Sequence, residues 1–319
     1  MENFAVLDFV IVAVYAVLII GLGFFFSRSK GKEKSTEDYF LAGKSLPWWA
    51  IGASLIAANI SAEQYIGMSG SGFASGLAIA SYEFMSALTL IIVGKFFLPI
   101  FIKQGIYTIP EFVEKRFSTN LKTILAVFWL ALFIFVNLTS ILFLGGKAID
   151  TIVGTGDGSL IMPAIFILAI VAVAYSLYGG LSAVAWTDVI QVILLVLGGV
   201  VTTVFALKAV SPDSSIVNGI SHVTDVAGDK FDMILSRDNP EYSNLPGIYV
   251  LIGGLWVANL YYWGFNQYII QRTLAAKSVS EAQHGIVFAA FLKMLIPFII
   301  VIPGIIAWVM YSEGYAGAT

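Results

Sequence analysis

Long apolar stretches follow one another along the chain and are separated by short polar segments. Residues 9–26 are apolar throughout, and a run of that length crosses the hydrocarbon core of a bilayer as one helix. No basic stretch precedes this run and no small-residue cleavage site follows it, so it is counted as a helix rather than a signal peptide. The pattern predicts eight spans, at residues 8–27, 47–73, 78–102, 122–146, 160–178, 184–208, 246–270 and 285–311.

The second span does not keep its apolar character. Within the sequence ASLIAANISAEQYIGMSGSG at 53–72, the polar residues Asn59, Ser61, Glu63 and Gln64 are followed by glycines and serines. Backbone that leaves helical geometry at membrane depth is tolerated only inside protein or beside a watery cavity. Polar side chains at that depth are costly and mark functional sites. The stretch therefore predicts a discontinuous helix that lines a transport site.

The seventh span shows a similar mixture. Residues 246–270 combine glycines with Asn259, Asn266 and Gln267. The second span is predicted to run from inside to outside and the seventh from outside to inside. A matched pair of interrupted spans in the two halves of a chain is the best sequence indication of a transporter binding site.

Composition supports the membrane class. The chain is 59% hydrophobic and only 12% charged, whereas soluble domains carry about 25% charged residues. The net charge of −3 argues against nucleic acid as a partner. The chain contains no cysteine, which excludes disulfides and thiolate metal sites.

Lysine and arginine in the connecting loops predict the orientation, because cytoplasmic loops carry an excess of both. Eleven such residues lie on one side and four on the other, and two of the four are in the long polar segment 209–245. The N-terminus and the C-terminus are therefore expected outside. The basic side holds Arg28, Lys30, Lys32, Lys34, Lys44, Lys103, Lys115, Arg116, Lys122, Arg272 and Lys277.

Two charged residues lie inside predicted spans, where each unpaired charge is expensive. Glu83 stands in the third span and Lys293 in the eighth. They either face a central cavity and bind a polar substrate, or form a structural ion pair, or the lysine snorkels to the interface. A ring with several hydroxyls suits the mixture of these two charges with the neutral groups of Gln64, Ser86 and Asn259, because each hydroxyl both donates and accepts. The apolar faces of Tyr82, Tyr262 and Trp263 suit the CH face of a pyranose.

Four stretches resemble the solute:sodium symporter family, and within it the bacterial members that import galactose or glucose. They are DYFLAGKSLPWW at 38–49, AANISAEQYIGMSGSG at 57–72, YGGLSAVAWTDVIQ at 178–191 and WVANLYYWGFNQYIIQRTLAAKS at 256–278. The resemblance extends over the chain apart from the outer loop. It implies an all-α polytopic membrane protein of the LeuT-type fold, with two inverted five-helix repeats and one extra N-terminal helix.

The resemblance also implies a division of the chain. Residues 1–46 would form the peripheral N-terminal helix and a cytoplasmic loop, 47–208 the first repeat, 209–245 an outer loop, and 246–319 the start of the second repeat. Family members continue through several more helices beyond the position of Thr319. We therefore expect an N-terminal fragment of a multi-pass protein of the bacterial inner membrane, which needs the missing C-terminal helices of the same protein.

By the resemblance, the sugar-contacting positions are Gln64, Tyr82, Glu83, Ser86, Asn259 and Lys293. Met68 and Tyr82 match the outer gate. Tyr262 matches the inner gate, with Trp263 beside it and Asn59 steadying it.

The co-transported ion is expected to be sodium, with no resident cofactor. Sodium prefers hard oxygen ligands, which unwound helix backbone supplies. The resemblance implies that the backbone carbonyls of Ala57 and Ile60 are two of these ligands and that the others lie on a helix beyond this chain. Asp188 would attract the departing ion, or else its charge stabilises a helix N-terminus.

The function expected from these residues and the resemblance is sodium-coupled sugar uptake by alternating access. One alternative is a sodium symporter for another solute, such as an amino acid, a carboxylate or inositol. A second is an intramembrane enzyme using Glu63, Glu83 or Asp188, although no paired acids or metal-ligand spacing support it. A third is a sensor or channel-like remnant that does not transport.

Overall fold

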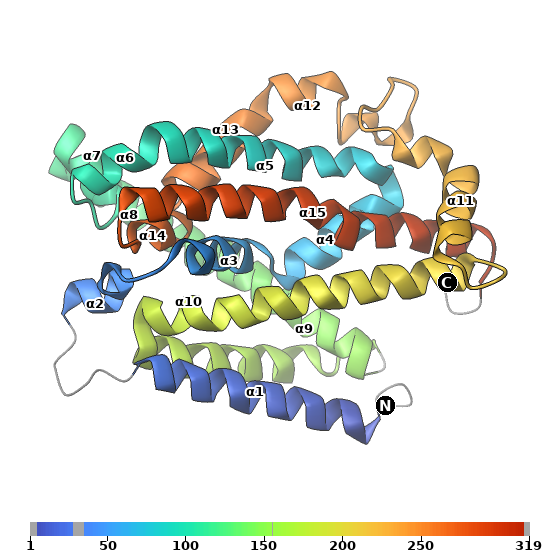
Figure 1. Ribbon diagram of the computed structural model, residues 1–319, viewed down its shortest axis with the longest axis horizontal. Coiled ribbons are helices and arrows are strands. Elements are labelled where there is room, and N and C mark those ends of the chain that lie inside the picture. The colour runs from blue at the N-terminus through green and yellow to red at the C-terminus, as the bar shows by residue number, and fades with distance from the viewer. Residues whose placement is uncertain (1–4, 28–34, 155, 316–319) are drawn as a thin grey trace.

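The computed structural model of the protein describes residues 5–27, 35–154 and 156–315, and within them the elements are helices joined by short turns (Figure 1). Arg28, Lys30, Lys32 and Lys34, which contribute to the predicted orientation, lie outside the described residues, as does the side chain of Glu63. The first half contains α1 (Val6–Ser27), α2 (Thr36–Leu41), η1 (Ala42–Lys44), α3 (Trp48–Asn59), α4 (Ala62–Ser75), η2 (Gly76–Ala80), α5 (Ser81–Ile92), η3 (Val93–Phe97), α6 (Leu98–Lys103), α7 (Ile109–Arg116), α8 (Thr119–Leu132), η4 (Phe133–Leu138) and α9 (Thr139–Val153).

The second half begins with the longest described helix, α10, which runs from Ile161 to Val210 and folds back on itself at Gly180. Gly180 has φ +61°, a left-handed conformation that glycine adopts without strain. This turn separates the predicted fifth and sixth spans. The remaining elements are α11 (Ile216–Val226), η5 (Gly228–Phe231), η6 (Pro240–Ser243), α12 (Ile248–Ile252), α13 (Gly254–Leu260), η7 (Tyr261–Phe265), α14 (Gln267–Leu274) and α15 (Val279–Ser312).

Five helical stretches of the described residues are long and apolar enough to cross a membrane, or six if one bent pair is a single span. One stretch, Gln64–Lys103, contains parts of two predicted spans, because the chain reverses at Gly76 between α4 and α5 (Figure 1). The predicted fifth span corresponds to the shorter apolar helix Ile161–Ala174. Helices are therefore present at all eight predicted positions. The beginning of α1 and the end of α15 lie at the same end of the bundle, as an even number of crossings requires (Figure 1).

The second span is broken, as the sequence predicts. α3 ends at Asn59, and Ile60 (φ −89°, ψ 108°) and Ser61 (φ −115°, ψ 177°) have extended backbone. The Ser61 hydroxyl then accepts a hydrogen bond from the backbone N–H of Gln64 and caps α4. The break therefore leaves helix ends inside the bundle instead of at its surface.

The seventh span is broken as well. It bends by 73° at Gly253. The π-helix η7 ends at Phe265, and the next residue, Asn266, has extended backbone (φ −78°, ψ 122°) before α14 begins. The span also reaches further than predicted, to Leu274 instead of residue 270. The prediction that Arg272 lies in a loop is therefore wrong: it is in α14 and only 8% exposed.

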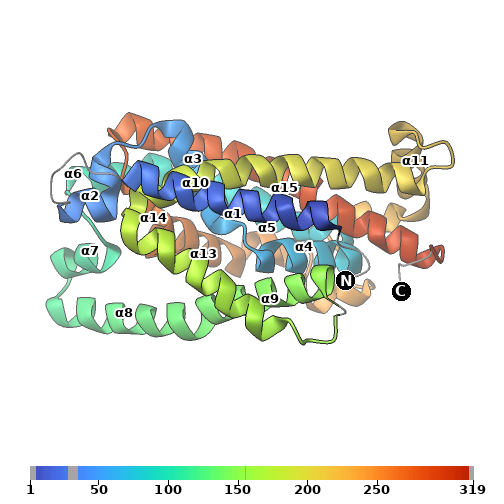
Figure 2. The same ribbon diagram turned by 90° about the horizontal axis from the view of Figure 1, so that it is seen from below.

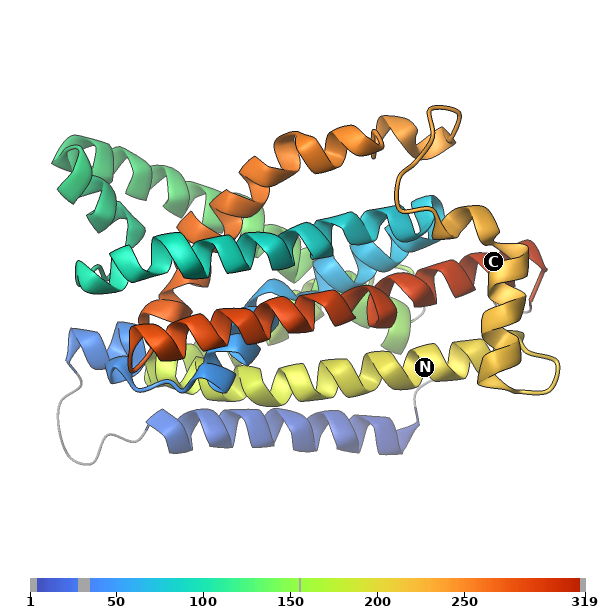
Figure 3. The same cartoon turned by 45° about the horizontal axis from the view of Figure 1, so that its top comes forward.

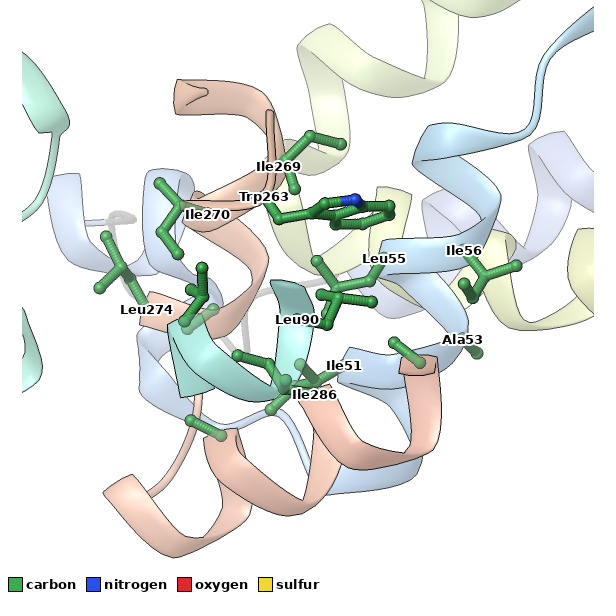
Figure 4. Packing of buried hydrophobic residues seen from close by; sticks show 14 of the residues in the cluster. Ile51, Ala53, Leu55, Ile56, Leu90, Trp263, Ile269, Ile270, Leu274 and Ile286 are labelled. Carbon is green, nitrogen blue, oxygen red and sulfur yellow. The ribbon is translucent and has the colours of Figure 1, made fainter. Parts of the chain in front are cut away.

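α15 lies at the centre of the helix bundle, with α3, α4 and α5 packed against it (Figures 1 and 3). Leu55, Leu90, Trp263 and Ile286 belong to the buried cluster between these helices and the broken seventh span (Figure 4). α1 packs along α10, and α8 runs along the lower edge of the molecule in Figure 2. Many apolar side chains of α1 and α8 are exposed, as expected for helices that face lipid.

Glycines let α4 and α15 approach each other at backbone distance. A Cβ atom on Gly72 would lie 2.6 Å from the carbonyl oxygen of Val301. A Cβ atom on Gly304 would overlap the carbonyl oxygen of Ser69. Larger residues at either position would push the two helices apart.

Short helices outside the predicted spans cover both ends of the bundle. The predicted outer loop 209–245 contains α11, which lies across the ends of α10 and α15 (Figure 1). At the opposite end, the Glu37 carboxylate of α2 accepts a hydrogen bond from the Tyr107 hydroxyl at 2.9 Å and pairs with Lys44 at 3.3 Å. The Tyr107 hydrogen bond, followed by Lys44, lowers the pKa of Glu37 below its ordinary value.

Candidate functional site

A cavity of about 350 Å³ lies beside the break between α3 and α4. Its walls come from both broken spans together with α5 and α15, so residues far apart in the sequence meet there. The lining includes all of the predicted sugar-contacting and gate residues: Asn59, Gln64, Met68, Tyr82, Glu83, Ser86, Asn259, Tyr262, Trp263 and Lys293. Leu255, Ala258 and Tyr261 complete it.

The two charged residues of the cavity form an ion pair. Lys293 Nζ lies 2.5 Å from Glu83 Oε2, and their side chains are 1% and 2% exposed. The other carboxylate oxygen of Glu83 accepts a hydrogen bond from Gln64 Nε2 at 2.6 Å. Lys293 also donates to Asn59 Oδ1 and lies 5.3 Å from the ring centroid of Trp263. The pair is thus electrically neutral as a unit, and each of its two members has a further polar partner.

The helix geometry places Glu83 and Ser86 on one wall. Glu83 stands in the first turn of α5, where the positive end of the helix dipole favours a carboxylate. Ser86 follows three residues later on the same face. Its hydroxyl lies 2.7 Å from Asn259 Oδ1, and Asn259 Nδ2 donates to the Leu255 carbonyl at 3.0 Å. This contact joins α5 to α13 across the cavity wall.

Tyr262, from η7, lines the cavity. Its hydroxyl accepts a hydrogen bond from Asn59 Nδ2 at 3.1 Å and lies 3.0 Å from the hydroxyl of Tyr268. Trp263, beside it in η7, is 2% exposed and packs in the core near Leu55 and Leu90 (Figure 4). The gate roles of Tyr262 and Trp263, like those of Met68 and Tyr82, stay predictions.

Asp188 lies outside this cavity, in a second buried cluster. Its Oδ2 atom accepts a hydrogen bond from Ser54 Oγ at 2.5 Å and lies 3.4 Å from Arg272 Nη2. Arg272 Nε donates to Ser54 Oγ at 2.8 Å, and Arg272 Nη1 donates to the Tyr268 carbonyl. The cluster fastens α14 to α3 and α10.

The two residues whose carbonyls are predicted to bind sodium flank the end of α3. Ala57 is in the last turn of α3, and Ile60 is the first residue after that helix. The carbonyls of a last helical turn have no intrahelical partner, so the break presents hard oxygen atoms inside the bundle. Their role as ion ligands stays a prediction.

Sequence reasoning missed Tyr268, Arg272 and a second polar cavity. This cavity of about 280 Å³ shares Asn59, Gln64 and Tyr262 with the first one. Asn137 reaches it from the π-helix η4, a distortion that often marks functional sites. The remaining lining residues are Ala58, Ser61, Val136, Ser140, Ile141 and Tyr268. Sequence does not mark a π-helix, which explains the omission.

Residues 39–319 match the Sodium:solute symporter family. The chain belongs to this family. It is 67% identical over 308 residues to the sodium/glucose cotransporter of Vibrio parahaemolyticus, a match that covers 96% of this chain and 56% of that protein. It is 33% identical over 327 residues to the human sodium/myo-inositol cotransporter, covering 97% of this chain and 45% of that protein. The chain thus spans about half the length of these relatives.

A solved structure of a sodium-coupled sialic acid symporter in a substrate-bound, outward-open state has the same fold. The TM-score is 0.82 at 24% sequence identity, over 99% of this chain and 64% of that chain. The family and the relatives are transporters, so the chain is grouped with transporters and not with enzymes.

Proposed function

We propose that this chain, together with the C-terminal part that its relatives have, is a sodium-coupled symporter that imports a neutral sugar such as glucose or galactose. The combined protein is called the full-length transporter below. The observation that carries the proposal is the cavity in which a buried, mutually neutralised acid and base stand among amide and hydroxyl groups.

The chemistry of this cavity favours a neutral polyol. Glu83 only accepts hydrogen bonds and Lys293 only donates them, while a sugar hydroxyl does both. A carboxylate substrate would need the Lys293 ammonium as its counter-charge, but that group is already paired with Glu83. The sodium/glucose name of the Vibrio relative supports a sugar. Myo-inositol has the same hydroxyl chemistry, and competition distinguishes it from a hexose.

The proposed transport cycle uses the two broken spans. Residues 47–208 form the first inverted repeat and 246–319 begin the second. Sodium binds at the carbonyls of Ala57 and Ile60 together with ligands from the C-terminal part, and Asp188 attracts it on release. Tyr262 is the inner gate, steadied by Asn59, while Met68 and Tyr82 form the outer gate. Sodium binding raises the affinity for sugar, and sugar raises the affinity for sodium by the same factor.

The proposed location is the bacterial inner membrane, with the N-terminus outside. Lysine and arginine counts in the loops support this orientation, also when Arg272 is left out of the count.

The test is uptake of radiolabelled glucose and galactose by the full-length transporter in proteoliposomes. Sugar accumulation should require external sodium and stop when potassium replaces it. An inside-negative potential of about 100 mV should raise accumulation roughly fiftyfold for one co-transported sodium ion. Accumulation that persists without sodium would refute sodium coupling. Stronger competition by myo-inositol, an amino acid or a carboxylate than by glucose would assign the cavity to that solute.

A further inference from the structure

The two polar cavities are separated by a wall that they share. The first, containing Leu255 and Met68, is nearer the outer part of the broken spans, while the second contains Ala58 and Tyr268. Tyr262 lines both of them, as do Asn59 and Gln64. The Tyr262 side chain is therefore part of the wall between the cavities.

Two residues hold the Tyr262 hydroxyl from opposite sides. Asn59, at the end of α3, donates to it at 3.1 Å, and Asn59 is itself held by Lys293. Tyr268 contacts it at 3.0 Å from the first turn of α14. Between Tyr262 and Tyr268 the helix is broken at Asn266, so this hydroxyl pair bridges the two halves of the seventh span.

Tyr268 is itself fixed by its surroundings. Its ring packs edge-on against Phe133 of η4, with centroids 5.6 Å apart. Its carbonyl accepts a hydrogen bond from Arg272, whose guanidinium also contacts Ser54 and Asp188. Tyr268 thus connects the Tyr262 hydroxyl to the cluster that fastens α14 to α3 and α10.

We infer that Tyr268 is a positioning residue that keeps Tyr262 across the passage between the two cavities, and that release of this hydroxyl pair opens the passage toward α14. The inference deepens the proposed function, because Tyr262 is the proposed inner gate. Without the hydrogen bond to Tyr268, the Tyr262 side chain is held only by Asn59 and rotates away from the passage between the two cavities more often. Solutes on the α14 side would then reach the first cavity more easily.

The test uses the absence of cysteine from residues 1–319. Any cysteine in the C-terminal part of the full-length transporter is first replaced. Two single-cysteine variants are then made: Ala258→Cys, in the first cavity, and Ala58→Cys, in the second. A small maleimide is applied in vesicles from the side on which α14 ends. Tyr268→Phe should raise the labelling rate of Ala258→Cys about two- to tenfold, the effect of one hydrogen bond. The rate at Ala58→Cys should not change.

Tyr65→Phe is the matched control. It removes a tyrosine hydroxyl that contacts the Ile299 carbonyl at 3.3 Å and lines neither cavity. It should leave both labelling rates unchanged. Because Tyr262→Phe already removes the hydroxyl pair, adding Tyr268→Phe to it should have no further effect.

Three results would overturn the inference. The first is that Tyr268→Phe leaves the labelling rate of Ala258→Cys unchanged, and the second is that it raises the labelling rates of both cysteines equally. The third is that the double variant, with Tyr262→Phe and Tyr268→Phe, labels faster than the variant with Tyr262→Phe alone. Equal increases would indicate that Tyr268 only stabilises the packing of α14. The labelling needs no sugar, so its outcome is independent of whether the transporter imports one. Absent sugar uptake with the expected labelling would refute the proposed substrate and leave the role of Tyr268 standing.

Discussion

Two buried ion pairs of this protein have the same chemistry and different surroundings. Glu83 and Lys293 line a cavity between the broken spans. Asp188 and Arg272 are packed between α3, α10 and α14, and their partners are a serine hydroxyl and a backbone carbonyl. Burial and pairing alone therefore do not indicate a binding site. An adjoining cavity with unlike polar groups does, because it gives a ligand both space and partners.

The largest effect is expected from breaking the cavity pair. Lys293→Ala leaves Glu83 as a buried, uncompensated charge, which costs about 3–5 kcal/mol. Sugar accumulation by the full-length transporter should be abolished. Uptake assays and measurement of the protein inserted in the membrane check this.

Gln64→Ala removes the neutral partner of Glu83. This variant should also abolish sugar accumulation while leaving the protein inserted in the membrane. Normal uptake in either Lys293→Ala or Gln64→Ala would refute the site.

The next effect concerns Tyr262. Tyr262→Phe keeps the aromatic face and loses the hydrogen bonds to Asn59 and Tyr268, whereas Tyr262→Ala loses both face and bonds. Sugar affinity should fall less in the phenylalanine variant, by about two- to tenfold for one net hydrogen bond. Equilibrium binding of labelled sugar measures both variants. Equal losses would show that the ring does not contact the sugar.

A smaller effect on sugar affinity is expected at the second pair. Asp188→Asn leaves Arg272 without its counter-charge and should lower the melting temperature. Affinity for sugar at saturating sodium should stay within about twofold, because Asp188 lies outside the cavity. Thermal melting and sugar binding on the same preparation test this separation. A loss of affinity as large as in Lys293→Ala would make the two pairs parts of one site.

The smallest effect is expected at the exposed pair of Glu37 and Lys44. The pKa of Glu37 is lowered, mainly by the hydrogen bond from Tyr107, so its stabilising contribution is present above the ordinary pKa of 4.5 and is lost as the pH falls through the lowered value. The melting temperature should therefore fall less on acidification in Tyr107→Phe than in the unmodified protein. Melting curves from about pH 7 to about pH 3 measure the difference, and sugar binding at neutral pH is the control. Identical acid sensitivity would show that this hydrogen bond does not contribute.

Much of the candidate site could be predicted from the sequence, because a charge or amide inside an apolar run is conspicuous. Glu83, Lys293 and Gln64 stand out in this way, and the small and polar residues after Ala57 correctly predicted the broken second span. Arg272 was misplaced because a cation after an apolar run has the pattern of a loop residue. Only tertiary packing brings it to Asp188.

The contacts between residues were less predictable than the residues themselves. Nothing in the aromatic run around Tyr262 distinguishes a hydroxyl that bonds to Tyr268 from one that faces lipid. The register of α5 against α13, which pairs Ser86 with Asn259, depends on side chains from several helices at once. The division into inverted repeats stays a prediction.

The glycine contacts of α4 with α15 have a mechanical consequence. Where Gly72 and Gly304 let two backbones touch, there is no layer of flexible side chains to absorb sliding. The outer half of the second span and the helix that bears Lys293 should therefore move as one rigid body. Any tilt of α4 would then carry the ammonium of the cavity with it, so the geometry around the substrate would change with the orientation of the helix.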